Sequence, residues 1–122
     1  LGVSPLAPDF ARIDAVTSRD DLARYFAANA RGFGPSPLAA FVTVDERNSS
    51  QHITALWQTG TALPDRSYYL EAAFADERAA YLAYLERLHE LAGLPGNASD
   101  AAETVLALET KLAEAQWTRV EN

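Results

Sequence analysis

The sequence contains no cysteine and no methionine among its 122 residues, and only two histidines. The absence of cysteine excludes disulfide bonds and thiolate chemistry. It does not identify the cellular compartment, because many exported bacterial proteins also lack cysteine. The absence of methionine means that Leu1 is not a translation start, and Asn122 directly follows a helical pattern. We therefore expect residues 1–122 to be a single partial domain of a longer protein.

Positive charge and long apolar runs are also scarce. The formal net charge is −7, and the ten basic residues are scattered along the chain. Nucleic-acid binding needs clustered basic residues that release counterions from phosphates, so we expect no nucleic-acid partner. No stretch approaches the roughly 18 apolar residues of a membrane span, and no charged and apolar leader opens the chain. We therefore expect no membrane span within these residues, while a targeting segment ahead of Leu1 stays open.

What remains is the composition of a globular chain. A domain of this length buries roughly two thirds of its unfolded surface, so the chain is long enough for a core. Alanine is abundant, and Lys111 is the only lysine among the ten basic residues. This composition is typical of GC-rich bacterial genomes.

Hydrophobic periodicity predicts a mainly α fold with one β-hairpin, in the manner of a fragment of a helical bundle. The expected helices cover residues 8–16, 18–30 and 75–92, and a fourth begins at Ser99 or Asp100.

Local signals support the ends of these helices. Pro8 is tolerated in a first helical turn, and Ser18 can cap the second helix. Gly32 follows the second helix at a position where a left-handed residue is useful. Gly93 and Pro95 end the third helix.

Apolar spacing predicts which helix faces pack. Leu22 and Phe26 should face the core from the second helix. The third helix gathers five apolar residues close to one face: Phe74, Tyr81, Leu85, Leu88 and Leu91. The fourth presents a seam at alternating spacings of four and three residues, typical of antiparallel or bundle packing: Ala101, Val105, Leu108, Leu112 and Ala115.

A hairpin is predicted between the second and third helices. Its strands cover 39–45 and 52–58, with β-branched and aromatic residues on both sides of the polar turn 46–51. The first strand contains Phe41 and Val44, and the second contains Ile53 and Trp57.

The stretch Leu63-Pro64-Asp65-Arg66-Ser67-Tyr68-Tyr69-Leu70 follows the hairpin. Pro64 fixes its own φ and biases Leu63 toward an extended conformation, while Asp65 can accept hydrogen bonds from amides just downstream. Tyr68 and Tyr69 supply rings that can be buried while their hydroxyls find partners. The stretch is therefore predicted to be a strand-to-helix corner packed on a core.

The most suggestive chemical motif is incomplete. His89-Glu90-Leu91-Ala92-Gly93 begins like H-E-x-x-H, in which two histidines one helical turn apart bind zinc. Gly93 occupies the place of the second histidine, so this motif cannot hold a catalytic zinc. We interpret His89 as a residue near the negative end of a helix dipole.

Other candidates are also better explained by structure. His52 is expected on the hairpin surface, and the acid pairs Asp20-Asp21 and Asp76-Glu77 suit first helical turns, where carboxylates complement the dipole. No serine or threonine has a plausible histidine and acid partner, and no Gly-rich phosphate loop follows a strand. We therefore predict no catalytic residue and no metal ligand in this chain, and substrate-binding residues are unknown.

Aromatic and asparagine motifs have two interpretations each. Trp57 and Trp117 suit core or interface anchors better than a substrate-stacking pair, and Tyr68 and Tyr69 suit a packed corner better than a peptide site. Two sequences match the N-glycosylation pattern, but both suit a turn or a helix cap: Asn48-Ser49-Ser50 and Asn97-Ala98-Ser99.

Residues 63–70 resemble a leucine-proline-x-arginine-x-tyrosine-tyrosine segment of the neprilysin-like zinc metallopeptidases, the M13 peptidase family. In that family the segment follows a loop with glutamine and glycine, here 58–62, although Thr59, Thr61 and Ala62 replace a more glycine-rich sequence. The resemblance extends along nearly the whole chain in the family's order. Its other stretches are Pro5 to Asp14 with Thr17-Ser18, Phe41 to Asp45 with Asn48, Ala107 to Ala113, Trp117, and Arg119 to Asn122.

The resemblance implies a longer parent protein that is a zinc-dependent endopeptidase, mainly helical, acting on short peptides in an enclosed cavity. The family's zinc ligands lie in H-E-x-x-H and a downstream glutamate, and none matches a position here. The implied partners are the catalytic lobe of the same polypeptide and the peptide substrates of the parent, with zinc bound by the parent and not by this fragment.

The implied role of residues 1–122 is therefore a scaffold or cavity wall, inactive alone. A free-standing helical module that binds a protein partner is the alternative. A periplasmic or secreted bacterial parent is the expected localisation.

Overall fold

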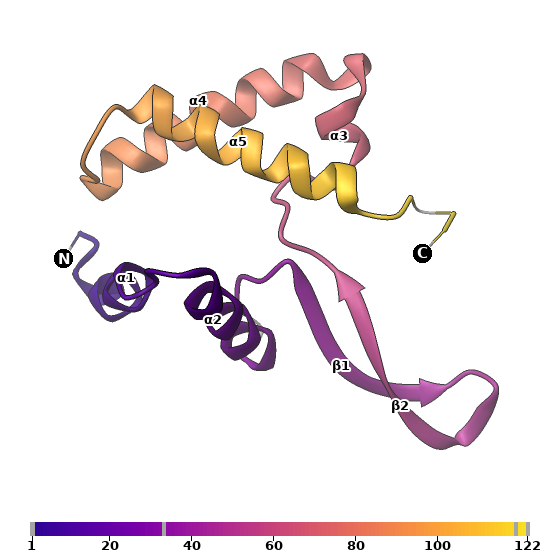
Figure 1. Ribbon diagram of the computed structural model, residues 1–122. Coiled ribbons are helices and arrows are strands. Elements are labelled where there is room, and N and C mark those ends of the chain that lie inside the picture. Colours follow the sequence, from indigo (N-terminus) through magenta and orange to yellow (C-terminus); the bar gives the residue numbers. More distant parts are fainter. Residues whose placement is uncertain (1, 33, 119, 122) are drawn as a thin grey trace. The chain divides into compact units, whose positions relative to one another are not determined.

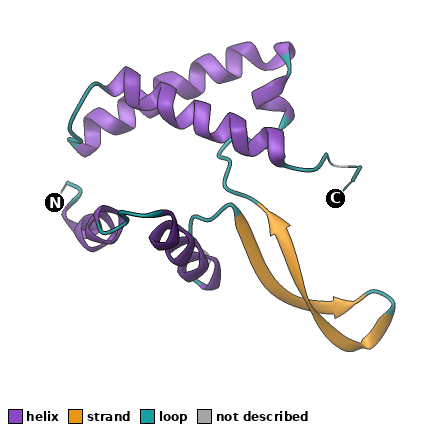
Figure 2. Ribbon diagram, viewed as in Figure 1, coloured by secondary structure: helices purple, strands orange, loops and turns teal. Residues whose placement is uncertain are grey.

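The computed structural model describes residues 2–32, 34–118 and 120–121, and within them it shows a mainly α fold with one β-hairpin, as predicted (Figures 1 and 2). Phe33 of the predicted loop, and Arg119 and Asn122 of the C-terminal stretch, lie outside the described residues. The elements are α1 (Ala7–Asp14), α2 (Arg19–Arg31), β1 (Leu38–Asp45), β2 (Asn48–Gln58), α3 (Ser67–Leu70), α4 (Ala75–Ala92) and α5 (Ala98–Ala115), with 3-10 turns at Ser4–Leu6 and Ala72–Phe74.

The chain divides into two compact units. One unit is Pro5–Gly60, which holds α1, α2 and the hairpin, and the other is Thr61–Asn122 with Leu1–Ser4. None of the described helices has the length and apolar character needed to span a bilayer.

The helix starts in Pro5–Gly60 follow the sequence signals. Pro8 lies in the first turn of α1, and the Ser18 hydroxyl accepts a hydrogen bond from the Asp21 amide at 3.1 Å, which caps α2. The prediction for Gly32 is wrong, because its φ is −104°. Its amide instead donates to the Asn29 carbonyl at 3.0 Å, a tight last turn that needs no left-handed residue.

The hairpin turn is tighter than predicted. β2 begins at Asn48 rather than at residue 52, and the register shifts between Val44 and Asp45. The Asp45 carboxylate accepts from the Arg47 amide at 2.8 Å, and the Asn48 side chain accepts from the Ser50 amide at 3.2 Å. These local bonds close the turn early, so polar residues that suggested a loop join the strand.

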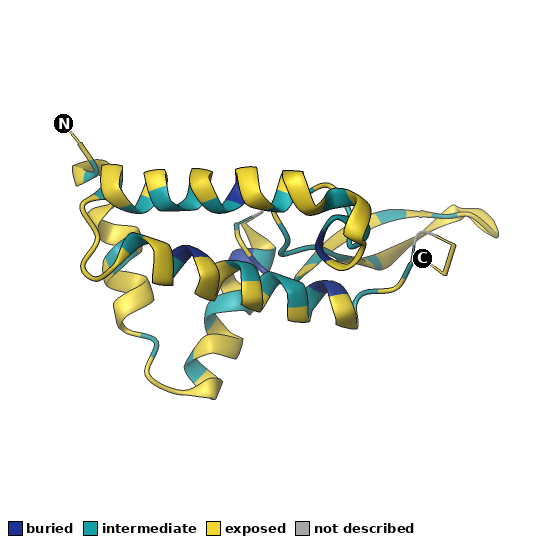
Figure 3. Ribbon diagram, turned by 90° about the horizontal axis from the view of Figure 1, so that it is seen from above, coloured by how far each residue is buried: buried dark blue, intermediate teal, exposed yellow. Residues whose placement is uncertain are grey.

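Few side chains are buried in Pro5–Gly60 (Figure 3). Among its described residues only Asn29 and Ser36 are buried, and Leu22, expected in the core, is 41% exposed. Phe26 is half-buried. The prediction for Leu22 is wrong because two short helices and a two-stranded ribbon offer too little apolar surface to cover both faces of α2.

The second unit is built on α4 and α5, which pack side by side in antiparallel directions (Figure 1). Gly93 ends α4 with a left-handed φ of 63°, a conformation that favours glycine. The Asn97 side chain accepts from the amides of Ser99 and Asp100 at 2.8 and 3.1 Å and caps α5, which begins at Ala98. The cap interpretation of the Asn97 motif is confirmed.

The seam predicted for α5 is correct only in part, because Ala101 and Leu112 are half-buried and its other members are exposed. Val105 and Leu108 are 37% and 59% exposed, whereas Ala102 and Ala113 are buried. The residues that pack inward again follow spacings of four, three and four: Ala102, Leu106, Glu109 and Ala113. Because Glu109 lies on this face, a search for apolar spacing alone does not identify it as buried.

The face predicted for α4 is correct only in part. Tyr81 is buried and Leu85 is half-buried, but Leu88 and Leu91 are 43% and 63% exposed. The best-buried side chain of α4 is therefore Tyr81, which reaches Glu109 on the inward face of α5.

Ala113 is fully buried, so its replacement tests the packing of α5. We expect Ala113→Leu to lower the free energy of unfolding by about 1–3 kcal/mol, because added methylenes cannot be accommodated in a packed site. Ala107→Leu, at an exposed position of the same helix, is the matched control and should stay within about 0.5 kcal/mol of the native chain. Urea unfolding followed by circular dichroism measures both, and equal effects would contradict the packing described.

Candidate functional site

The Leu63–Leu70 stretch forms the predicted corner. The Asp65 carboxylate accepts a hydrogen bond from the Ser67 amide at 2.9 Å, and α3 begins at Ser67. Tyr69 is only 5% exposed, so its ring is a core residue. The prediction of a packed strand-to-helix corner is confirmed.

Glu109 joins this corner to two other helices. The Tyr69 hydroxyl donates to Glu109 Oε2 at 2.7 Å, and the Tyr81 hydroxyl donates to Glu109 Oε1 at 3.2 Å. The Tyr69 oxygen also accepts from the Leu63 amide at 2.8 Å. We call Tyr69, Tyr81 and Glu109 the carboxylate cluster.

The environment keeps both tyrosines of the carboxylate cluster protonated. Burial raises the pKa of Tyr69 to about 12, and the Glu109 carboxylate adds to that rise against the opposing effect of the Leu63 amide. Burial, together with the negative charge of Glu109, also raises the pKa of Tyr81 well above its ordinary value. Neither hydroxyl is poised to act as a base near neutral pH.

Two arginines tie the corner to backbone carbonyls. Arg66 Nε donates to the Ala113 carbonyl of α5 at 3.0 Å. One nitrogen of Arg78 in α4 donates to the carbonyls of Tyr68 and Glu71 at 2.6 and 2.8 Å. The Tyr68 ring stacks on Phe74 with centroids 4.1 Å apart. The corner's polar side chains thus hold α3 against α4 and α5.

Neither histidine belongs to a metal-binding group of the described residues. His89 lies in the last turn of α4 with Nε2 3.1 Å from the Pro95 carbonyl, and His52 lies exposed in β2 in the other unit. Among the described residues, no three His, Asp or Glu side chains are grouped to hold a metal ion. These residues do not fit a zinc site, and the absence of catalytic residues from the chain stays a prediction.

The acid pairs lie where the helix-dipole interpretation puts them. Asp20 and Asp21 are in the first turn of α2, and Asp76 and Glu77 are in that of α4. Hydrogen bonds from the Ser18 hydroxyl, and then from Thr17, lower the pKa of Asp21. These carboxylates are therefore placed to stabilise the N-terminal ends of their helices.

The two tryptophans are not core residues. Trp57 is 54% exposed on the hairpin and Trp117 is 64% exposed after α5. The interpretation of these side chains as core anchors is wrong for the described chain, and their use at an interface stays a prediction.

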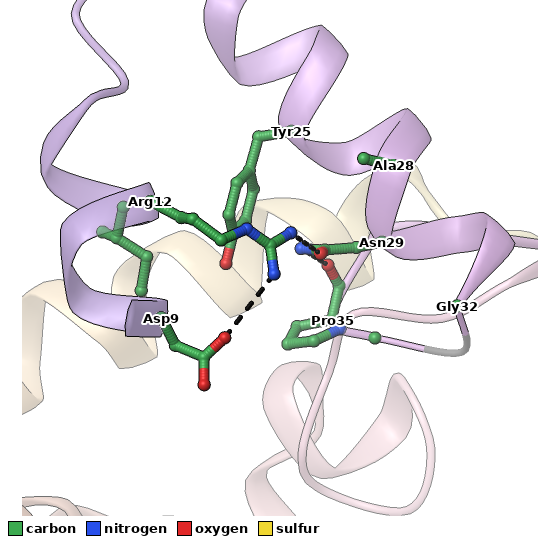
Figure 4. Close-up of a pocket in the computed structure, with 9 residues that line it drawn as sticks. Asp9, Arg12, Tyr25, Ala28, Asn29, Gly32 and Pro35 are labelled. Carbon is green, nitrogen blue, oxygen red and sulfur yellow. Dashed lines mark hydrogen bonds and ion pairs between the residues drawn. The ribbon is translucent and has the colours of Figure 1, made fainter. Parts of the chain in front are cut away.

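A pocket of about 450 Å³ in Pro5–Gly60 was missed by sequence reasoning (Figure 4). Arg12 lies 3.5 Å from the Asp9 carboxylate, donates to Asn29 Oδ1 at 3.1 Å, and stands 5.7 Å from the centre of the Tyr25 ring. The buried Asn29 also donates to the Pro35 carbonyl at 3.0 Å. The described lining residues are Asp9, Arg12, Ile13, Tyr25, Ala28, Asn29, Gly32, Gly34 and Pro35.

The pocket offers recognition groups but no catalytic pair. The charge of Arg12 is offset by Asp9, and both side-chain groups of Asn29 are bonded within the chain. Asn29 falls on the same face of α2 as Leu22 and Phe26, three residues after Phe26. A polar residue on this otherwise apolar face of α2 is the one sequence feature that could have indicated the pocket.

Comparison with known proteins gives consistent matches over the chain. A family model described as peptidase family M13 matches residues 1–122. Endothelin-converting enzyme-like 1 is 38% identical in Rattus norvegicus and 35% in Homo sapiens, over 74 residues that are 59% of this chain and 9% of either relative.

Solved structures match over more of the chain. The Mycobacterium tuberculosis zinc metalloprotease Zmp1 in its open state has a TM-score of 0.81 and 34% identity, covering 98% of this chain and 19% of that one. Zmp1 in complex with an inhibitor gives the same TM-score and identity, covering 95% of this chain and 18% of that one. The chain thus spans less than a fifth of each of these relatives.

Removal of one hydroxyl tests the carboxylate cluster. We expect Tyr69→Phe to lower the free energy of unfolding by about 1–3 kcal/mol, because the Leu63 amide and Glu109 both lose a partner. Tyr84→Phe is the matched control, since Tyr84 is 57% exposed, and it should change stability by less than about 0.5 kcal/mol. Urea unfolding distinguishes these outcomes, and a neutral Tyr69→Phe would contradict a stabilising cluster.

The raised tyrosine pKa values also predict sensitivity to alkali. Below pH 10 tyrosine is protonated in both folded and unfolded chains, but between pH 10 and about 12 it ionises only when unfolded, so stability falls as pH rises. Each tyrosine contributes a slope of up to about 1.4 kcal/mol per pH unit. We expect Tyr69→Phe to flatten the decline measured by urea unfolding across this range, and an unchanged slope would exclude Tyr69 as its source.

Proposed function

Because the chain belongs to peptidase family M13, we propose that it is a scaffold portion of a zinc-dependent endopeptidase that cleaves short peptides. Its match to the family model over residues 1–122 confirms the membership expected from the Leu63–Leu70 stretch. The matching solved structures are of a zinc metalloprotease, and both extend far beyond the matched region. The parent's zinc, its peptide substrates and its catalytic lobe belong to the proposal.

The observation that carries the scaffold role is how the side chains of the Leu63–Leu70 stretch are engaged. Arg66 is bonded to a backbone carbonyl of α5, and Tyr69 is buried against Glu109. Side chains engaged in this way hold helices together and are withdrawn from substrate. The Leu63–Leu70 stretch therefore supports a structural contribution to the parent enzyme.

Catalysis by the parent then requires residues outside 1–122. Zinc polarises a peptide carbonyl and activates water, which needs about three protein ligands held in a fixed geometry. The described residues of this chain supply no such group. Second-shell contacts and a shaped cavity hold zinc ligands in place, so scaffold helices contribute to activity without touching substrate.

We further propose that residues 1–122 form a partial domain that supports the wall of an enclosed cavity in the parent. Such a wall admits short peptides and excludes large folded proteins. The whole-length family match favours this role over the free-standing interaction module. A periplasmic or secreted location of the parent stays a prediction.

The coding sequence and the protein it encodes test this function. We expect the reading frame to continue for several hundred residues and to encode H-E-x-x-H and a later glutamate ligand. The full-length protein should bind zinc stoichiometrically and cleave short peptides, and a zinc chelator should abolish cleavage while added zinc restores it.

Residues 1–122 alone serve as the control and should neither bind zinc at sub-micromolar strength nor cleave peptides. Zinc binding at that strength or peptide hydrolysis by this chain alone would contradict the scaffold assignment. A stop codon shortly after residue 122 would instead favour the interaction module.

A further inference from the structure

The hairpin presents an apolar surface that nothing in its own unit covers. Directly paired residues lie on the same face of an antiparallel ladder, and the register pairs Val42 with Thr54 and Ala40 with Leu56. We define the outer face of the hairpin by the apolar residues on that side: Leu38, Ala40, Val42, Val44 and Leu56.

The two faces of the hairpin differ in their surroundings. On the other face, Ala39, Thr43 and Ala55 are half-buried, and α2 contacts β1. The large side chains of that face, Phe41, Ile53 and Trp57, are 40%, 45% and 54% exposed. On the outer face the exposed fractions are higher, at 70% for Val42 and 67% for Leu56. The outer face is therefore the less covered side of the ribbon.

The sequence of β1 indicates a strand that is buried on both faces. Leu38 to Val44 is apolar at every position except Thr43, a continuous run rather than an alternation of apolar and polar residues. A ribbon of two strands is marginally stable in water, and exposed apolar strands tend to associate. The apolar residues of β1 are therefore suited to packing against a further apolar segment.

Charge argues against a second copy as that cover. Each chain carries a formal net charge of −7, so two copies repel one another. The same charge disfavours an anionic lipid surface. The outer face carries no carboxylate, lysine or arginine, and its one titratable side chain is His52, opposite Val44, so it suits an uncharged apolar partner surface.

The length of the matching protein favours a partner segment within the same polypeptide. The chain spans 19% of the matching Zmp1 chain, which leaves about four fifths of that protein outside the matched region. A segment of the same polypeptide is present at high effective concentration and pays little entropy for docking.

We propose that the outer face is a docking surface for an apolar segment of the same polypeptide beyond residue 122. This rests on the proposed function, because that function supplies the longer parent. It adds a specific surface and the chemistry of its partner, neither of which follows from the Leu63–Leu70 stretch.

Site-specific photocrosslinking in the full-length protein tests the docking. Benzoylphenylalanine replaces Val42 or Leu56 on the outer face, and replaces Glu46 in the exposed turn as the matched control. Irradiation is followed by separation of monomer and by mass spectrometry of the crosslinked peptides. We expect Val42 and Leu56 to label one common region beyond residue 122, several-fold more efficiently than Glu46 does.

Three results would overturn the proposal. Crosslinks between two copies would identify a self-association surface, and crosslinks into residues 61–122 would show that the chain covers its own hairpin. Labelling from Val42 and Leu56 no stronger than from Glu46 would show that the outer face is solvent-exposed. Two probe positions guard against a local misfolding of either variant.

Zinc content and peptide cleavage of the unsubstituted full-length protein separate this proposal from the proposed function. An active enzyme without the expected crosslinks overturns the docking alone. Crosslinks beyond residue 122 in a protein that neither binds zinc nor cleaves peptides support the docking and overturn the enzymatic proposal.

Discussion

The Glu109 carboxylate is the acceptor on which the unit Thr61–Asn122 depends. It receives the hydroxyls of Tyr69 from α3 and Tyr81 from α4, so one side chain of α5 connects three helices. A hydroxyl bond to an ionised carboxylate is short and stronger than a neutral one, as the 2.7 Å distance to Tyr69 illustrates. Its partial burial makes the bonds mutually dependent, because a buried polar group left without a partner costs more than the bond itself contributes.

This arrangement explains why the Leu63–Leu70 stretch places strict requirements on its residues. The corner needs a turn at Pro64 and Asp65, an arginine long enough to reach a carbonyl of α5, and a buried tyrosine with a hydroxyl acceptor. Each requirement is geometric, so few substitutions satisfy it.

The unit Pro5–Gly60 shows the opposite balance. Its polar contacts, centred on Arg12 and Asn29, are well paired, while much of its apolar surface is exposed. The hairpin is the clearest case, since both of its faces carry exposed apolar side chains. Such a unit gains stability from further surface, which is the physical basis for the proposed docking on the outer face.

Several features follow from chemistry that is local in the sequence. The caps at Ser18 and Asn97, the left-handed end at Gly93 and the corner at Asp65 depend on contacts within a few residues, and all were predictable. Tertiary structure alone decided which face of α5 is buried, because Glu109 is acceptable inside only when tyrosines from two other helices reach it. It also decided the pocket beside Asn29 and the exposure of Leu22. Those outcomes depend on what other elements cover, and a periodic pattern records only that one face is apolar.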